Sequence, residues 1–195
     1  MIVTITGPSG SGKTSLLRLL CRWFPDRVHA MVSSTTRPPR QNEEHGIDYF
    51  FVPPEAFDNK ELMIEQVEFG GNLYGLTKDI IEKAYNDSAI WIAVVDVEGS
   101  LWLKEHYGAI RAYMKISRGS SKFRLESRDG EEAAKIRHQI DINKGLYDFE
   151  GYDILIRCNQ KKLRKIAKQF IEQMAPYTSE ENCLFWIENE STTPT

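Results

Sequence analysis

Short apolar runs and longer amphipathic segments alternate along most of this chain. The apolar runs predict strands at residues 2–6, 28–32, 90–97, 110–116 and 152–156. The amphipathic segments predict helices at residues 13–24, 77–85, 99–106 and 161–174, with a further helix that begins at residue 131. Alternating strands and helices are typical of a parallel sheet with helices on both faces, so we predict a three-layer α/β/α fold.

Two stretches interrupt this alternation. Residues 33–85 are polar and turn-rich, and they contain short strand-like pieces at 49–52, 63–69 and 72–74. Residues 118–130 are strongly charged. We interpret the first stretch as a small mixed α/β insert in the core fold. The tail at 175–195 is polar apart from residues 184–187, which could dock on the core or on a partner.

Composition limits the location and the partners more than the function. The 195 residues suffice for one domain with a sizeable core, and the net charge of −3 provides no general attraction for nucleic acid or an acidic membrane. The cysteines, Cys21, Cys158 and Cys183, are odd in number and scattered, which favours a reduced, intracellular protein. No segment approaches the length of a membrane span, and the chain starts with a predicted core strand rather than a signal peptide. We therefore expect a cytoplasmic protein with no nucleic-acid or membrane partner.

The clearest chemical motif lies between the first predicted strand and the first predicted helix. Its glycines let the backbone turn so that N–H groups point at phosphate oxygens. Its lysine reaches the β- and γ-phosphates, and the hydroxyl that follows ligates magnesium. The candidates for ATP binding are the phosphate loop and the next residue: Gly7, Pro8, Ser9, Gly10, Ser11, Gly12, Lys13, Thr14 and Ser15. A Gly/Ser surface turn is the alternative, but the flanking strand and helix disfavour it.

A second candidate is Asp96, near the end of the apolar run 90–97. A carboxylate at the carboxyl end of a buried strand, in a chain with a phosphate loop, suits an acid on the magnesium side of the site. The same aspartate could equally cap the helix that follows. We favour the metal role, which makes Thr14 and Asp96 the candidate metal ligands.

The insert carries several short motifs in a characteristic order. It begins Ser33-Ser34-Thr35-Thr36-Arg37-Pro38-Pro39-Arg40, continues through Glu43 to Tyr49-Phe50-Phe51, and then gives Ile64-Glu65 and Gly71-Asn72-Leu73-Tyr74-Gly75. This arrangement resembles the guanylate kinase family, over residues 2 to about 174. The resemblance implies a kinase that converts GMP or dGMP to GDP or dGDP with ATP and Mg²⁺, by direct in-line transfer. It also implies a monomer or a weak homodimer.

The resemblance assigns the acceptor side of the site to the insert. Arginine forks and tyrosine hydroxyls suit a monophosphate, and a carboxylate can accept both N1–H and N2–H of guanine. Glu65 would read the base in this way, together with Ser33. The implied GMP-binding residues are Ser33, Arg37, Arg40, Glu43, Tyr49, Glu65, Tyr74 and Asp96.

The charged segment at 118–130 is similar to the lid of that family. Lid arginines would neutralise charge that develops during phosphoryl transfer and would exclude water. The implied catalytic residues are Lys13, Arg37, Arg124, Arg128 and Arg137. The expected division of the chain is a core at 1–32, 88–117 and 150–174, a monophosphate-binding insert at 33–87, a lid with its following helix at 118–149, and a tail at 175–195.

Three features depart from the family pattern. Leu76 stands where the family usually has a hydroxyl that donates to guanine O6, so we expect GMP binding weaker by about 0.5–1.5 kcal/mol and a similar gain from Leu76→Ser. Val94 stands where the family's strand has a first aspartate before the one at position 96. The interval between the lid arginines and Arg137 is shorter than usual.

Two alternatives stay open at this point. One is a related kinase for another deoxynucleoside monophosphate or a ribose phosphate, although Glu65 has no obvious use on a bare sugar phosphate. The other is a protein-binding module of the guanylate kinase type. Such modules typically lack a working phosphate loop, so the Lys13-Thr14 pair favours the enzyme.

Overall fold

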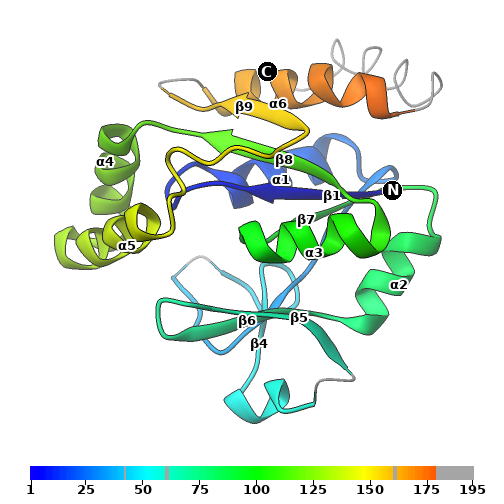
Figure 1. Ribbon diagram of the computed structural model, residues 1–195, viewed down its shortest axis with the longest axis horizontal. Coiled ribbons are helices and arrows are strands. Elements are labelled where there is room, and N and C mark those ends of the chain that lie inside the picture. Colours follow the sequence, from blue (N-terminus) through cyan, green and yellow to red (C-terminus); the bar gives the residue numbers. More distant parts are fainter. Residues whose placement is uncertain (42, 60–61, 160–161, 179–195) are drawn as a thin grey trace.

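A five-stranded parallel sheet forms the centre of the molecule (Figure 1). The computed structural model describes residues 1–41, 43–59, 62–159 and 162–178. The spatial order of the strands is β2-β7-β1-β8-β9, with bounds β1 (Ile2–Thr6), β2 (Val28–Met31), β7 (Ile90–Val94), β8 (Ile110–Lys115) and β9 (Ile154–Arg157). The parallel sheet expected from the apolar runs is therefore confirmed.

Apolar side chains cover both faces of this sheet. Successive side chains of a strand point to opposite faces, so Val3 and Ile5 of β1 belong to a first core and Ile2 belongs to a second core. Ile92 and Trp91 of β7 divide in the same way between the first core and the second. Burial on both faces explains why these strands are continuously apolar in the sequence.

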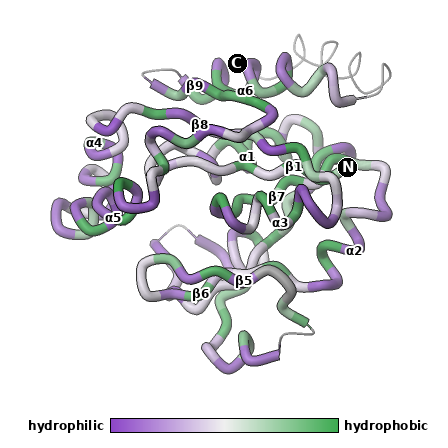
Figure 2. Tube along the Cα trace, in the orientation of Figure 1, coloured by the Kyte–Doolittle hydropathy of each residue, from purple (hydrophilic) through white to green (hydrophobic). Residues whose placement is uncertain are grey.

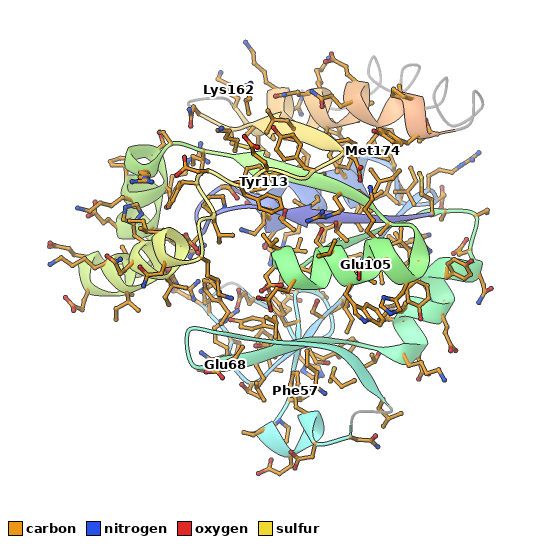
Figure 3. All side chains as sticks on the ribbon, viewed as in Figure 1. Phe57, Glu68, Glu105, Tyr113, Lys162 and Met174 are labelled. Atoms are coloured by element: carbon orange, nitrogen blue, oxygen red, sulfur yellow. The ribbon has the colours of Figure 1, made fainter. Side chains whose placement is uncertain are left out.

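Helices cover the two faces and complete three layers. The first core packs against α1 and α6, and the second against α2 and α3, with bounds α1 (Lys13–Trp23), α2 (Lys78–Asn86), α3 (Val97–Tyr107) and α6 (Leu163–Met174). Figure 3 labels Met174 on α6 and Glu105 on α3, in the helices on opposite sides of the sheet. Within the described chain, no helix combines the length and apolar character needed to cross a membrane.

The strand order reverses at β1. Strands β7 and β2 lie on one side of β1, and β8 and β9 lie on the other. In open parallel sheets, ligands bind beyond the carboxyl ends of the strands at such a point of reversal. The phosphate loop follows β1 directly, so the topology places it at the expected binding position.

The insert forms a second, mixed sheet below the first (Figure 1). Its strands lie in the order β4-β3-β6-β5, with bounds β3 (Ser34–Thr35), β4 (Phe50–Phe51), β5 (Met63–Phe69) and β6 (Asn72–Thr77), and a short 3-10 helix spans Pro54–Phe57. Gly70 and Gly71 connect β5 to β6 with positive φ angles of 60° and 74°. Two consecutive positive φ angles are typical of the tight hairpin turn that matches strand twist.

The charged segment forms a helix and is followed at once by another. Helix α4 (Arg118–Asp129) is capped by Ser117, whose side chain accepts the N–H of Ser120, and α5 (Glu131–Asn143) follows Gly130. Figure 1 shows α4 and α5 together at one end of the main sheet, and Figure 2 shows prominent hydrophilic positions along both. We call α4 and α5 the lid helices below.

One element boundary differs clearly from the sequence prediction. The strand predicted at 90–97 ends at Val94, and α3 begins at Val97. The side chain of Asp96 accepts the backbone N–H of Gly99 at 2.9 Å and so caps α3. The prediction was wrong here because the apolar residues after Val94 look like strand, whereas the cap starts a helix among them.

Candidate active site

One cavity of about 470 Å³ brings the phosphate loop, the insert and the lid helices together. It is lined by most of the residues that the sequence predicted for the site: Gly7, Ser9, Gly10, Ser11, Gly12, Lys13, Thr14, Ser15, Ser33, Arg37, Arg40, Tyr49, Tyr74, Asp96, Arg124, Arg128 and Arg137. Pro8 and Glu43 do not line it. The backbone of Glu65 lies in β5, but its side chain is outside the described part of the structure. Segments far apart in the sequence therefore meet around a single space.

The phosphate loop has a conformation that depends on glycine. Gly7 has a φ of 141°, and a Cβ atom at this position would lie 2.5 Å from the carbonyl oxygen of Met114. The Nζ of Lys13 donates to the carbonyls of Gly7 at 2.7 Å and Pro8 at 3.0 Å. Burial lowers the pKa of the Lys13 ammonium to about 8. The ammonium is thus held inside the curve of the loop, where nucleotide phosphates bind in loops of this type.

Two arginines of the insert are held by one carboxylate. Nη2 of Arg37 donates to both Glu43 oxygens at 3.0 and 2.8 Å, and Nη1 of Arg40 donates to Glu43 at 3.2 Å. Burial alone would raise the pKa of the Glu43 carboxyl, but the hydrogen bonds and positive charges of the arginines outweigh it and hold the pKa below its ordinary value. Glu43 was predicted to bind GMP; in the structure it does not line the cavity, and its carboxylate contacts Arg37 and Arg40.

Aromatic rings support Arg37. The guanidinium carbon of Arg37 lies 5.5 Å from the ring centre of Tyr49, and the rings of Tyr49 and Tyr74 lie 5.9 Å apart at 70°. Arg37 is only 7% exposed, and its buried Nε has no hydrogen-bond partner within the described residues. The insert therefore presents a fixed guanidinium and two tyrosines toward the cavity.

The lid arginines contact the core and the insert. Arg124 donates to the carbonyls of Gly10 at 3.2 Å and Cys158 at 3.1 Å, which joins α4 to the phosphate loop and to the end of β9. Arg128 pairs with Asp129 at 2.6 Å, and Arg137 of α5 approaches the same carboxylate at 3.6 Å.

Asp129 also connects the lid to the insert. Its carboxylate lies 4.0 Å from Nε of Arg40. The pKa of Asp129 is lowered, first by the hydrogen bonds from Arg128 and then by the charges of Arg40 and Arg137. The sequence analysis missed Asp129. The only sequence signal was an acidic residue at the end of a basic segment.

Comparison with known protein families shows which family this chain belongs to. A model of the guanylate kinase family, described as "Guanylate kinase", matches residues 1–176. The chain belongs to the guanylate kinase family. The guanylate kinase of Chlamydia felis is 36% identical over 176 residues, which cover 86% of this chain and 85% of that protein. The guanylate kinase of Helicobacter pylori strain HPAG1 is 30% identical and covers 97% of each chain.

The solved structures support the fold. A guanylate kinase from Anaplasma phagocytophilum matches with a TM-score of 0.62 at 20% identity, covering 92% of this chain and 87% of that one. This match confirms the predicted fold class, a P-loop α/β core with a small mixed insert. The resemblance inferred from the motifs of the insert is likewise confirmed.

The structure changes the interpretation of one departure from the family pattern. Leu76 is fully buried in the second core and does not line the cavity. In the β5–β6 hairpin it lies opposite Glu65. The expected improvement in GMP use from Leu76→Ser is therefore not supported, because a serine would replace core volume rather than face the cavity.

Asp96 has two contacts in the structure. Besides capping α3, its second carboxylate oxygen lies 3.4 Å from Nζ of Lys144, at the end of α5. The helix-capping alternative is thus observed, and Asp96 also lines the cavity beside Val94. Lys144 was missed by the sequence analysis. Lys144 follows α5 directly, about two turns after Arg137, and this places it beside Asp96.

Proposed function

We propose that this chain transfers the γ-phosphoryl group of ATP directly to GMP or dGMP. The observation that carries the proposal is the single cavity in which the phosphate loop faces the insert's arginine and tyrosine cluster. A phosphoryl donor held by the loop and an acceptor monophosphate held by the insert would share this space. In-line transfer requires such an arrangement, because attacking and leaving oxygens lie on opposite sides of the transferred group.

The donor side would be built from the phosphate loop. Its backbone N–H groups and the N-terminus of α1 suit the β-phosphate, and Lys13 can exchange the carbonyls of Gly7 and Pro8 for phosphate oxygens. Phosphate oxygens are stronger acceptors for an ammonium than neutral carbonyls are. Lys13 would then stabilise charge on the β- and γ-phosphates during transfer.

The acceptor side would be built from the insert. Arg37 and Arg40 would bind the monophosphate with Tyr49 and Tyr74, and Glu43 would keep both arginines oriented. Ser33 and Glu65 would face the base. A carboxylate at position 65 accepts the N1–H and N2–H donors of guanine, whereas other bases would present acceptors to it.

The lid arginines would complete the charge balance of the reaction. Arg124, Arg128 and Arg137 all line the cavity and would neutralise charge on the transferring group. No covalent intermediate and no general base are needed, since phosphoryl transfer depends mainly on positioning and electrostatics.

The donor groups of the cavity fit Mg²⁺ bound together with ATP. Magnesium is usually held by one or two protein oxygens plus substrate phosphates and water, and the Thr14 hydroxyl and the Asp96 carboxylate are such oxygens. Within the described residues, no cluster of three acidic, histidine or cysteine side chains offers a closed metal site. The ion would supply positive charge to the phosphates. One carboxylate oxygen of Asp96 would ligate the ion while the other caps α3.

The location, the partners, the oligomeric state and the domain bounds belong to the same proposal. We place the reaction in the cytoplasm, with ATP and GMP or dGMP as the partners and with a monomer or weak homodimer as the active form. The core would comprise residues 1–32, 88–117 and 150–174, the monophosphate-binding insert 33–87, and the lid with its helix 118–149. The separate mixed sheet of the insert supports this division.

A coupled assay of ADP formation tests the proposal. The purified chain is given ATP, Mg²⁺ and one of GMP, dGMP, AMP, dTMP or ribose 5-phosphate. We expect rapid turnover with the two guanylates and little with the others. Turnover with a different acceptor would support the related-kinase alternative, and ATP binding without any turnover would support a binding module.

A further inference from the structure

An ion pair outside the main cavity joins α1 to the insert. Nε of Arg18 in α1 donates to Oδ1 of Asp48 at 2.8 Å, and Nη2 of Arg18 donates to the same oxygen. The side chain of Arg18 is 47% exposed, whereas that of Asp48 is 2% exposed. A carboxylate so far from water is costly unless charged or polar groups pair with it. Asp48 therefore depends on its partners more than the carboxylate of an ordinary surface ion pair does.

Asp48 belongs to a tight turn that ends at Tyr49. Its Oδ2 accepts the backbone N–H of Glu44 at 3.0 Å, and its own N–H donates to the carbonyl of Glu44 at 3.0 Å. The N–H of Gly46 donates to the carbonyl of Tyr49 at 2.9 Å. We call these residues the 44–49 turn. One oxygen of Asp48 thus folds the turn, and the other connects the turn to α1.

A second cavity, of about 390 Å³, lies between the 44–49 turn and α1. Arg18 and Asp48 both line it, and it shares Thr14 and Tyr49 with the main cavity. Because a cavity lies here, close packing does not fix the distance between the turn and the helix at this place. The ion pair spans this space and can therefore set that distance.

Both ends of this connection lead to the active site. Arg18 lies four residues after Thr14, so the two side chains share a face of α1 directly after the phosphate loop. Asp48 immediately precedes Tyr49, whose ring centre lies 5.5 Å from the guanidinium carbon of Arg37. Tyr49 and Arg37 are two of the groups proposed to bind the acceptor monophosphate. The ion pair therefore connects the helix of the donor side to the turn that carries an acceptor-binding group.

We propose that Arg18 and Asp48 are positioning residues for the acceptor nucleotide, whose ion pair holds the 44–49 turn, and with it Tyr49, at the distance from the phosphate loop at which the monophosphate binds. They act through Tyr49 and do not themselves contact the nucleotide, and neither residue lines the main cavity. This inference rests on the proposed function.

The test is the binding of GMP and of ATP to the full chain, each measured by calorimetry. Arg18→Ala removes the connection and leaves the hydrogen bonds within the turn intact. We expect its Kd for GMP to rise about three- to tenfold, because the turn then spends only part of its time at the binding position. The Kd for ATP should change by less than about twofold, since the phosphate loop keeps its own contacts. Arg22→Ala is the matched control: it removes the same charge one turn farther along α1, beside the same cavity, and should leave both Kd values near those of the wild type.

Two further variants separate this role from a general loss of stability. Arg18→Lys restores the positive charge, so it should bind GMP more tightly than Arg18→Ala does. Asp48→Asn keeps an oxygen for the N–H of Glu44 but presents an NH₂ group to Arg18, so its loss of GMP affinity should match that of Arg18→Ala. The double variant Arg18→Ala/Asp48→Asn should bind GMP no more weakly than either single variant, because both changes remove one interaction.

Three results would overturn the proposal: unchanged or tighter GMP binding in Arg18→Ala, an equal loss for ATP and GMP, or additive losses in the double variant. If Asp48→Asn does not fold, the GMP affinities of Arg18→Ala and Arg18→Lys decide the question. A wild type that binds ATP but not GMP would overturn the proposed function, and this inference with it. The wild-type measurement comes first, so the two failures are distinguishable.

Discussion

Leu76→Ser should destabilise the protein rather than improve its use of GMP. Leu76 is 0% exposed and belongs to the second core with Met31, Ile81 and Leu103. Loss of the buried leucine carbons costs about 2–5 kcal/mol, as in Leu→Ala substitutions in cores. A hydroxyl placed among apolar neighbours adds about 1–3 kcal/mol. We therefore expect the free energy of unfolding to fall by roughly 3–8 kcal/mol.

Urea unfolding followed by circular dichroism measures this loss, and thermal unfolding should show a Tm lower by about 6–30 °C. Leu101→Ser is the matched control, since Leu101 is 43% exposed on α3 and the same exchange should change stability by no more than about 0.5 kcal/mol. The placement of Leu76 would be refuted by a Leu76→Ser protein as stable as the Leu101→Ser control. A simultaneous rise in kcat/KM for GMP would show that the side chain faces the guanine instead.

Three further substitutions test the proposed site. Lys13→Ala should lower kcat by roughly 10²–10³-fold at unchanged Tm, because nothing adjacent replaces its charge on the phosphates; near-normal turnover would remove the phosphate-loop assignment. Arg40→Lys should raise the KM for GMP much more than the KM for ATP, since lysine lacks the bidentate fork, and equal effects would place Arg40 elsewhere. Glu65→Gln should cost about 1.5–3 kcal/mol in transition-state binding of GMP, measured as kcat/KM, and an unchanged preference over AMP and dTMP would contradict its role as base reader.

The sequence predicted the elements whose signals are local. Strand β1, the phosphate loop and α1 follow one another as expected, because apolar periodicity and glycine spacing act over a few residues. The two-residue strand β3 has no periodicity of its own, since it exists only through pairing with β4 and β6. The end of β7 could be predicted only by recognising Asp96 as a helix cap. The apolar residues around Asp96 obscured this role.

Site residues that belong to a recognisable motif could be predicted from the sequence. Residues whose role is to contact other side chains could not. Arginines in a known motif order indicate phosphate, so the sequence predicted Arg37 and Arg124 for the site, and both line the cavity. Asp129 pairs with side chains from other segments, and its position in the sequence carries no such information. Leu76 shows the opposite error: it shares a face of β6 with Tyr74, but the second core covers its side chain, and a position in a motif does not reveal such burial.

The ion pair of Arg40 with Asp129, which joins the insert to the lid, has a mechanical consequence. In the part of the chain that the structure describes, Arg37, Arg40, Arg128 and Arg137 pair with two carboxylates, Glu43 and Asp129, which leaves an excess of positive charge along the seam. Packed apolar surfaces have one best fit, whereas a long, partly exposed ion pair such as Arg40–Asp129 tolerates changes in distance at small cost. The insert and the lid are thus tethered at this seam without being locked. Arg40 can exchange Asp129 for a phosphate oxygen while Glu43 still holds it, so the insert can move relative to the lid without losing all of its contacts at once.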